Sequence, residues 1–220
     1  MIVSTRKRFI FVHNPKCGGT SVRRALRAFD TTGDFFWLYD EKDGKTIDKA
    51  HLPLSILKDE YPDYFALFDD YFSFMFVRNP YSRIISAFNE TRDALYATHD
   101  TEDGREGYVR SLNELIGGMT GDMVDGWTFD FRHFVRQVDF AYLGTKRYVD
   151  LVMKIEDYPQ CLEALRLLRP DLALKLRGAR HRNSRPMAGS FQDYLTPASI
   201  AIVNRIYERD FRIFGYEMIG

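Results

Sequence analysis

The sequence predicts an α/β fold in which a central parallel sheet is flanked by helices on both faces. Apolar stretches of strand length alternate with stretches whose apolar residues recur at helical spacing, a pattern typical of parallel sheets with helical connections. A hydrophobic fraction of 45% suffices for a substantial core, and no repeat or low-complexity tract interrupts the 220 residues. We therefore expect a single domain over residues 1–220.

The first expected elements are a strand, a glycine-containing turn and a helix. Residues 9–12 form a short apolar strand, and the turn behind it carries Lys16 and two adjacent glycines. Apolar residues then recur at helical spacing as far as Phe29. Glycines let backbone N–H groups approach a phosphate, and a helix N-terminus adds unpaired donors and a positive dipole. This segment predicts a binding site for a nucleotide-like ligand.

A second strand and helix carry an arginine and a serine. Residues 71–77 form an apolar strand that ends at Arg78, and Asn79 is the expected N-cap of a helix over residues 80–97. Ser86 follows Arg78 by eight residues and lies about two turns into this helix. A guanidinium and a hydroxyl so placed can converge on one phosphate group.

The rest of the chain is expected to contain one more strand, several helices and polar loops. An acidic, turn-rich stretch covers residues 40–48, and a buried strand is expected at 150–155. Polar loops are expected at 99–107 and 117–126. The further helices are expected at residues 53–69, 108–117, 158–168 and 197–210, the last capped by Thr196.

The residue order in the first turn argues against two common phosphate loops. A nucleoside-triphosphate loop places its lysine after the glycines, whereas Lys16 precedes them, and no G-x-G-x-x-G dinucleotide motif is present. Pro-Lys-Cys-Gly-Gly-Thr-Ser after a strand instead resembles the 5′-phosphosulfate loop of sulfotransferases, which use 3′-phosphoadenylyl sulfate (PAPS) as donor. Arg78 with Ser86 resembles the 3′-phosphate motif of the same family.

The resemblance covers nearly the whole chain. Four further segments resemble the branch of the family that includes polysaccharide and glycosaminoglycan sulfotransferases. They are His51-Leu-Pro-Leu, residues 152–157, Arg182-Asn-Ser and residues 207–216. Two positions depart from the commoner pattern, because Cys17 stands where threonine is usual and Asn14 where an aliphatic residue is usual. Since the phosphate cradle consists mostly of backbone N–H groups, neither departure argues against donor binding.

The resemblance implies a P-loop-like sheet and a sulfuryl transfer from PAPS to a hydroxyl group, with a carbohydrate as the expected acceptor. It implies that Lys16 stabilises the leaving group and that His51 is the catalytic base. No metal is expected, because fixed cations and N–H dipoles supply the positive field. The residues expected to bind the donor are Lys16, Cys17, Gly18, Gly19, Thr20, Ser21, Arg78, Ser86, Arg182 and Arg185.

Several alternatives stay open at this point. His51 can instead cap a helix that starts near Pro53, and His133 and Glu156 are the other candidates for the base. Gln137 either contacts the acceptor or holds a loop. A nucleotide kinase or NTPase is the alternative enzyme, and a non-catalytic nucleotide-binding module of the same fold is the alternative without catalysis.

Charge and hydropathy limit the partners. Seven Lys or Arg stand against one Asp in residues 1–30 and again in 166–185, whereas 39–70 is acidic. We expect the basic clusters to line a cleft for the polyanionic donor, and no nucleic-acid partner, because no recognition motif accompanies them. The sequence lacks an apolar signal core and a stretch long enough to span a membrane, so a cytoplasmic, bacterial enzyme is expected. Two cysteines exclude a disulfide framework.

Overall fold

The computed structural model of this mixed α/β protein describes residues 1–95, 104–125, 128–178 and 189–220. The chain forms two compact units that alternate along the sequence. The first unit comprises Met1–Arg78 and Gln137–Ser184, and the second comprises Asn79–Arg136 and Arg185–Gly220.

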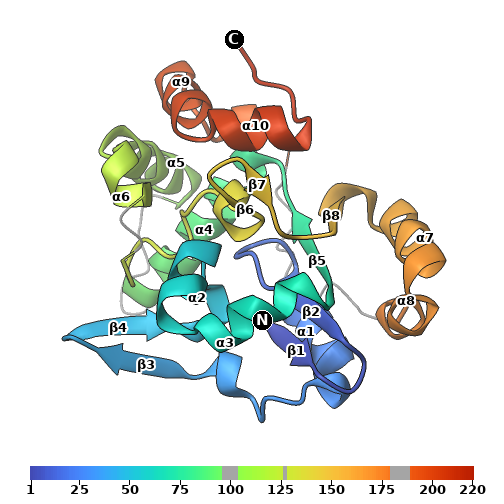
Figure 1. Ribbon diagram of the computed structural model, residues 1–220. Coiled ribbons are helices and arrows are strands. Elements are labelled where there is room, and N and C mark those ends of the chain that lie inside the picture. The colour runs from blue at the N-terminus through green and yellow to red at the C-terminus, as the bar shows by residue number, and fades with distance from the viewer. Residues whose placement is uncertain (96–103, 126–127, 179–188) are drawn as a thin grey trace. The chain divides into compact units, whose positions relative to one another are not determined.

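A four-stranded sheet in the order β1-β2-β5-β8 forms the centre of the first unit (Figure 1). The strands β2 (Phe9–Val12), β5 (Phe72–Val77) and β8 (Leu151–Lys154) are parallel, which confirms the three strands expected from the sequence. The edge strand β1 (Ile2–Ser4) is not predicted by the sequence and pairs antiparallel with β2. The sheet is therefore mixed, because its three parallel strands carry one antiparallel strand at the edge.

Aromatic residues of β2 and β5 build the core of the first unit. One face of the sheet contributes Phe9, Phe11, Phe74, Phe76 and Met153 to this core. The alternate residues point to the other face and are also buried, namely Ile10, Val12, Met75 and Val77. Burial on both faces explains why the two strands are continuous apolar runs. β8 is only partly buried, in contrast to the buried strand that was expected.

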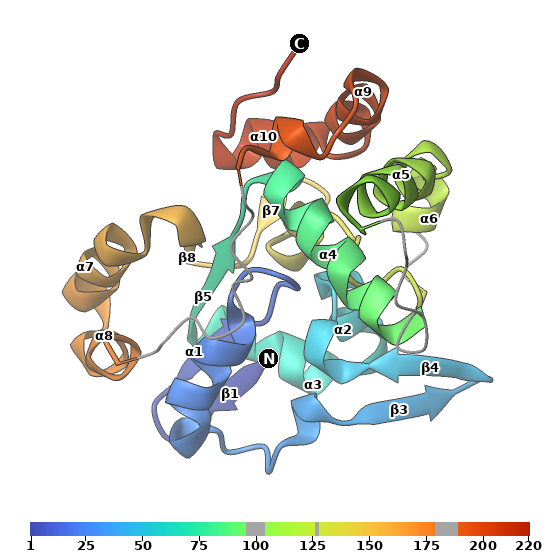
Figure 2. The same cartoon turned by 180° about the vertical axis from the view of Figure 1, so that it is seen from behind.

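Three helices contribute apolar side chains to this core, and Figures 1 and 2 label their ribbons. They are α1 (Gly19–Leu26), α7 (Tyr158–Leu168) and α8 (Pro170–Leu176). α7 has the bounds that the sequence predicts, and α8 begins directly at a proline, which suits the first position of a helix because it needs no N–H donor there. α8 packs against both α1 and α7.

The prediction of a single helix over residues 53–69 is wrong, because this segment forms three short helical pieces. They are α2 (Leu54–Glu60), α3 (Pro62–Ala66) and a 3₁₀ turn at Leu67–Asp69. Tyr61 lies between the first two, with φ −138° and ψ 58°. The ring of a proline disfavours helical geometry in the residue before it, so Pro62 accounts for the break.

The acidic stretch at residues 40–48 belongs to a β-hairpin. Its strands are β3 (Tyr39–Lys42) and β4 (Lys45–Asp48), joined by Asp43 and Gly44. Both turn residues have positive φ, 50° and 70°, which is the geometry that an Asp-Gly pair favours between antiparallel strands. A second small hairpin joins β6 (Tyr142–Leu143) to β7 (Lys146–Arg147).

The described residues of the second unit form mainly helices. They are α4 (Pro80–Leu95), α5 (Gly104–Gly117), α6 (Gly121–Asp125), α9 (Pro197–Ile206) and α10 (Glu208–Phe214). The Asn79 side chain accepts the Tyr81 N–H at 3.0 Å and the Thr196 hydroxyl accepts the Ser199 N–H at 3.2 Å, so both predicted caps are confirmed. The core of this unit includes Phe88, Leu112, Phe134, Val203 and Phe211.

Three expectations for the second unit are wrong in part. The loop predicted at 99–107 already becomes helical at Gly104, and the loop predicted at 117–126 contains α6, whose Val124 is buried. Apolar packing thus outweighs the weak helix propensity of the glycines. The helix predicted at 197–210 breaks at Tyr207, where φ is −106° and ψ 20°. Residues 99–103 and 126 lie outside the described part of the chain.

Within the described ranges, no helix combines the length and the hydropathy that a membrane span requires.

Candidate functional site

The predicted phosphate loop lies between β2 and α1. Lys16 and Gly18 both adopt left-handed backbone geometry, with φ of 62° and 75°. Alternation of this kind turns successive backbone N–H groups toward one side, as in anion-binding nests. The first turn of α1, which is fully described, holds no acidic residue, so its positive dipole end is not neutralised from within the helix. The loop therefore has the local geometry of an anion site.

Position 19 requires a glycine, because the ring of His13 lies where the Cβ atom of any other residue would be. A Cβ atom added at Gly19 would lie 1.9 Å from Cδ2 of His13, far inside van der Waals contact. The His13 ring is buried and packs against the rings of Phe11 and His51, with centroids 6.0 and 4.4 Å away. It therefore has little room to move aside for a methyl group.

Replacing Gly19 with alanine is expected to destabilise the protein by about 1–3 kcal/mol, because the added methyl displaces either the His13 ring or the start of α1. Thermal unfolding of the purified variant measures this effect. The matched control is Gly178→Ala, since a Cβ there meets no atom within 4 Å. Equal melting temperatures for the two variants would contradict the close approach.

Arg78, the arginine of the second motif, contacts the loop of the first. It follows β5 directly, and its guanidinium Nη1 donates to the carbonyl oxygen of Lys16 at 3.4 Å. Ser86 lies half-buried in α4 and belongs to the second unit. Arg182 and Arg185 lie outside the described residues.

Gln137 holds the backbone next to the loop. Its side chain is fully buried, its Nε2 donates to the Arg78 carbonyl at 2.8 Å, and its Oε1 accepts the Arg78 N–H at 2.8 Å. Of the two roles left open for Gln137 by the sequence, the geometry favours the structural one. Neither cysteine has the surroundings of a nucleophile: Cys17 is 1% exposed, and burial raises the pKa of Cys161 to about 11.

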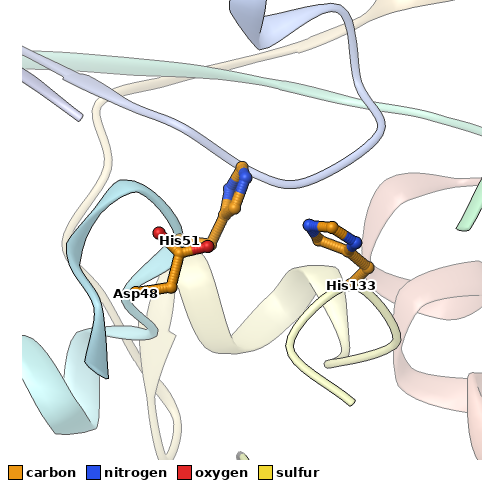
Figure 3. A group of neighbouring side chains, drawn as sticks. All are labelled: Asp48, His51 and His133. Atoms are coloured by element: carbon orange, nitrogen blue, oxygen red, sulfur yellow. The ribbon is translucent and has the colours of Figure 1, made fainter. Parts of the chain in front are cut away.

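His51 ends a short 3₁₀ helix, Lys49–His51, which follows β4. Asp48 caps it, because Oδ1 accepts the Ala50 N–H at 2.9 Å. Nδ1 of His51 lies 3.2 Å from the carbonyl oxygen of His13. A carbonyl oxygen only accepts, so in the neutral ring this contact places the hydrogen on Nδ1 and the lone pair on Nε2. Figure 3 shows the ring turned toward the segment that joins β2 to α1.

The geometry around α2 gives no support to the capping role that the sequence left open for His51. The N-cap position of α2 is Pro53, which makes no side-chain hydrogen bond to the helix. Asp48 lies beside His51 in Figure 3, with a carboxylate oxygen and a ring nitrogen within 4.8 Å of each other. Asp48 and His51 are therefore neighbours within the first unit.

The two other candidate bases differ in their surroundings. His133, also drawn in Figure 3, is buried in the second unit, next in sequence to the core residue Phe134. Glu156 is exposed in the 3₁₀ helix Ile155–Asp157, directly behind β8. Both stay alternatives to His51.

An aromatic ring lies next to the two histidines of the first unit. Trp37 is 46% exposed, and its ring is nearly parallel to that of His13, at 4° and a centroid distance of 6.2 Å. The Arg23 guanidinium lies 4.4 Å from the Trp37 centroid and pairs with Asp34. A hydrogen bond from Arg27 is the main cause that lowers the pKa of Asp34 below its ordinary value. The Trp37 ring thus has the Arg23 guanidinium and the His13 ring as neighbours.

Both basic clusters are engaged in ion pairs within the first unit. In residues 1–30, Arg23 pairs with Asp30 and Asp34, and Lys7 pairs with Asp171. In the second cluster the pairs are Arg169–Asp171, Arg166–Glu163 and Arg177–Glu163. These residues thus have acidic partners within the protein, and the donor cleft expected at the basic clusters stays a prediction.

Comparison with known proteins agrees with the motifs. The sequence profile of the Sulfotransferase family matches residues 1–217. Carbohydrate sulfotransferase 10 of Xenopus laevis is 25% identical over 240 aligned positions, which cover 99% of this chain and 67% of that protein. No solved structure matches significantly.

Proposed function

This chain belongs to the sulfotransferase family, and we propose that it transfers the sulfuryl group of PAPS to a hydroxyl group of a carbohydrate. The observation that carries the proposal is the contact between the two phosphate motifs, in which the Arg78 guanidinium donates to the carbonyl of Lys16. A P-loop-like arrangement, with helices on both faces of the sheet, is part of this proposal.

The donor is held by its two phosphate groups. The 5′-phosphate lies at the start of α1, where backbone N–H groups donate to it. These groups belong to Cys17, Gly18, Gly19 and Thr20, and the side chains of Lys16 and Ser21 complete the site. The left-handed geometry of Lys16 and Gly18 supports this assignment. The 3′-phosphate is bound by Arg78 and Ser86, together with Arg182 and Arg185.

The transfer is a displacement at sulfur. The acceptor oxygen forms a bond to sulfur while the bond between sulfur and the bridging oxygen of the 5′-phosphate breaks. The hydroxyl proton moves to Nε2 of His51, whose Nδ1–H is held by the His13 carbonyl. The ammonium group of Lys16 stabilises the negative charge that develops on the bridging oxygen. This scheme uses no metal ion.

Two observations support a carbohydrate acceptor. The relative from Xenopus laevis is named a carbohydrate sulfotransferase. The exposed part of Trp37 lies next to His13, whose ring contacts that of His51, and an aromatic surface suits the apolar face of a sugar ring. Incubation with labelled PAPS and a panel of glycans and phenols tests this acceptor class. Transfer to phenols alone would contradict it, and no transfer at all would favour the non-catalytic module.

Adenosine 3′,5′-bisphosphate is expected to bind roughly 10- to 100-fold more tightly than AMP, because charge-assisted hydrogen bonds from the 3′-phosphate motif are lost with AMP. Titration calorimetry measures both affinities. In Arg78→Ala the bisphosphate should lose most of this advantage while the affinity for AMP changes little. Equal affinities in the wild-type protein would contradict the 3′-site, and preference for ATP with magnesium would favour a kinase or NTPase.

The cytoplasmic location expected from the sequence stays a prediction.

A further inference from the structure

We infer that Gln137 is a positioning residue that fixes the two phosphate motifs of the donor site relative to each other. The inference rests on the proposed function, because it states that Gln137 contributes to the binding of PAPS. All the atoms that carry it belong to the first unit.

The buried amide of Gln137 joins the phosphate loop to the end of β5. Its Oε1 accepts from the backbone N–H of Arg78 at 2.8 Å, from Nδ2 of Asn14 at 3.1 Å and from Sγ of Cys17 at 3.3 Å. Its Nε2 donates to the carbonyl of Arg78 at 2.8 Å. Asn14 also donates to the carbonyl of Phe76 in β5, at 3.0 Å. One side chain therefore contacts both motifs.

The two partners in the loop are the residues that depart from the commoner family pattern, Asn14 and Cys17. Nδ2 of Asn14 also lies 3.2 Å from Sγ of Cys17, so the departures and Gln137 form one hydrogen-bonded group. A buried amide that loses its hydrogen-bond partners is left with unpaired polar atoms, which costs free energy of folding. The Gln137 amide keeps all its partners only while the loop and β5 stay at their present distance. The group thus sets the distance between the anion-binding turn and Arg78.

The position of Gln137 in the chain strengthens this role. The chain leaves the first unit after Arg78 and returns to it at Gln137. The two hydrogen bonds between the Gln137 amide and the Arg78 backbone therefore join the point of exit to the point of return. Because the Arg78 guanidinium donates to the Lys16 carbonyl, a shift of the Arg78 backbone also disturbs the loop.

The variant Gln137→Glu tests the inference through its pH dependence. An ionised carboxylate places an acceptor against the Arg78 carbonyl, so the hydrogen bond that Nε2 of Gln137 donates there is lost. A protonated carboxyl group can donate to this carbonyl as the amide does. Calorimetry with adenosine 3′,5′-bisphosphate at pH 8 should show affinity lower than wild type by roughly 10- to 100-fold. Because position 137 is fully buried, we expect the pKa of the introduced carboxyl group to lie above its ordinary value. At pH 5.5 the ratio to wild type, measured at the same pH, should therefore return toward one. Gln137→Met, which neither donates nor accepts strongly, should stay weak at both pH values.

Ser73→Ala is the matched control for loss of stability. Ser73 is also buried in the first unit, near the start of β5, and its hydroxyl bonds the Tyr148 carbonyl and the Asp150 carboxylate. It should lower the melting temperature but leave the affinity for the bisphosphate unchanged.

Three results would overturn the inference: wild-type affinity in both Gln137 variants, absence of pH recovery in Gln137→Glu, or an equal loss of affinity in Ser73→Ala. If the wild-type protein itself fails to prefer the bisphosphate over AMP, the proposed function fails instead.

Discussion

Replacing Lys16 with methionine is expected to lower kcat by roughly 10²- to 10³-fold, the usual effect of removing one group that stabilises a developing oxyanion. The affinity for adenosine 3′,5′-bisphosphate should fall much less. The ammonium group matters most when the bridging oxygen becomes negative, and interactions that strengthen in the transition state act on kcat. Single-turnover and steady-state assays with labelled PAPS at saturating donor separate the two effects.

The backbone geometry at Lys16 makes methionine the suitable replacement. Lys16 is a non-glycine residue with φ 62°, so a substitution by glycine would change the flexibility of the loop together with the charge. Methionine keeps the Cβ atom and most of the length of the side chain while removing its charge. The control is Lys45→Met, since Lys45 is exposed in the β3–β4 hairpin and should leave turnover unchanged. Wild-type turnover in Lys16→Met would contradict the role in leaving-group stabilisation.

Local signals in the sequence predict most of the elements that carry the candidate site. Runs of apolar residues mark β2 and β5, and Asn79 with a following proline marks the start of α4. The glycine turn before α1 is found in the same way. Each of these signals acts within a few residues, so the local sequence suffices to predict the element. The break at Tyr61 also has such a cause, in the proline that follows it.

The contacts that assemble the site depend on residues far apart in the chain. His51 bonds the carbonyl of His13, 38 residues away, and Gln137 bonds Asn14, 123 residues away. No periodicity predicts such pairs, because the sheet order and the packing of the loops decide them. The ion pairs of Arg23 with Asp30 and Asp34 likewise depend on tertiary packing, which a count of basic residues does not reveal.

Asp48 is a residue that the sequence interpretation did not connect to the site. Its cap on the 3₁₀ helix of His51 is a local signal, an aspartate that accepts the N–H two residues later. The proximity of Asp48 to the His51 ring follows from this cap. A search for caps before the histidine would have found it.

Replacing His51 with asparagine is expected to lower kcat by roughly 10²- to 10⁴-fold, the usual contribution of a positioned acid–base group. An asparagine amide can donate to the carbonyl of His13 from about the place of Nδ1, but it has no basic nitrogen in the place of Nε2. The variant should therefore keep the melting temperature and the affinity for adenosine 3′,5′-bisphosphate. In the wild-type enzyme, activity should fall at acid pH, because a protonated imidazole has no lone pair for the hydroxyl proton.

His51→Ala separates the hydrogen bond from the chemistry. It removes the donor to the His13 carbonyl as well as the base, so it should lose activity to the same extent as His51→Asn and also melt at a lower temperature. Rate assays at saturating PAPS and acceptor, with thermal unfolding of both variants, provide the comparison. If His51→Asn transferred sulfate at the wild-type rate, the imidazole would serve only to hold the turn between β2 and α1. The proton would then have to move to His133 or Glu156, and the same pair of measurements on variants of those residues would decide between them.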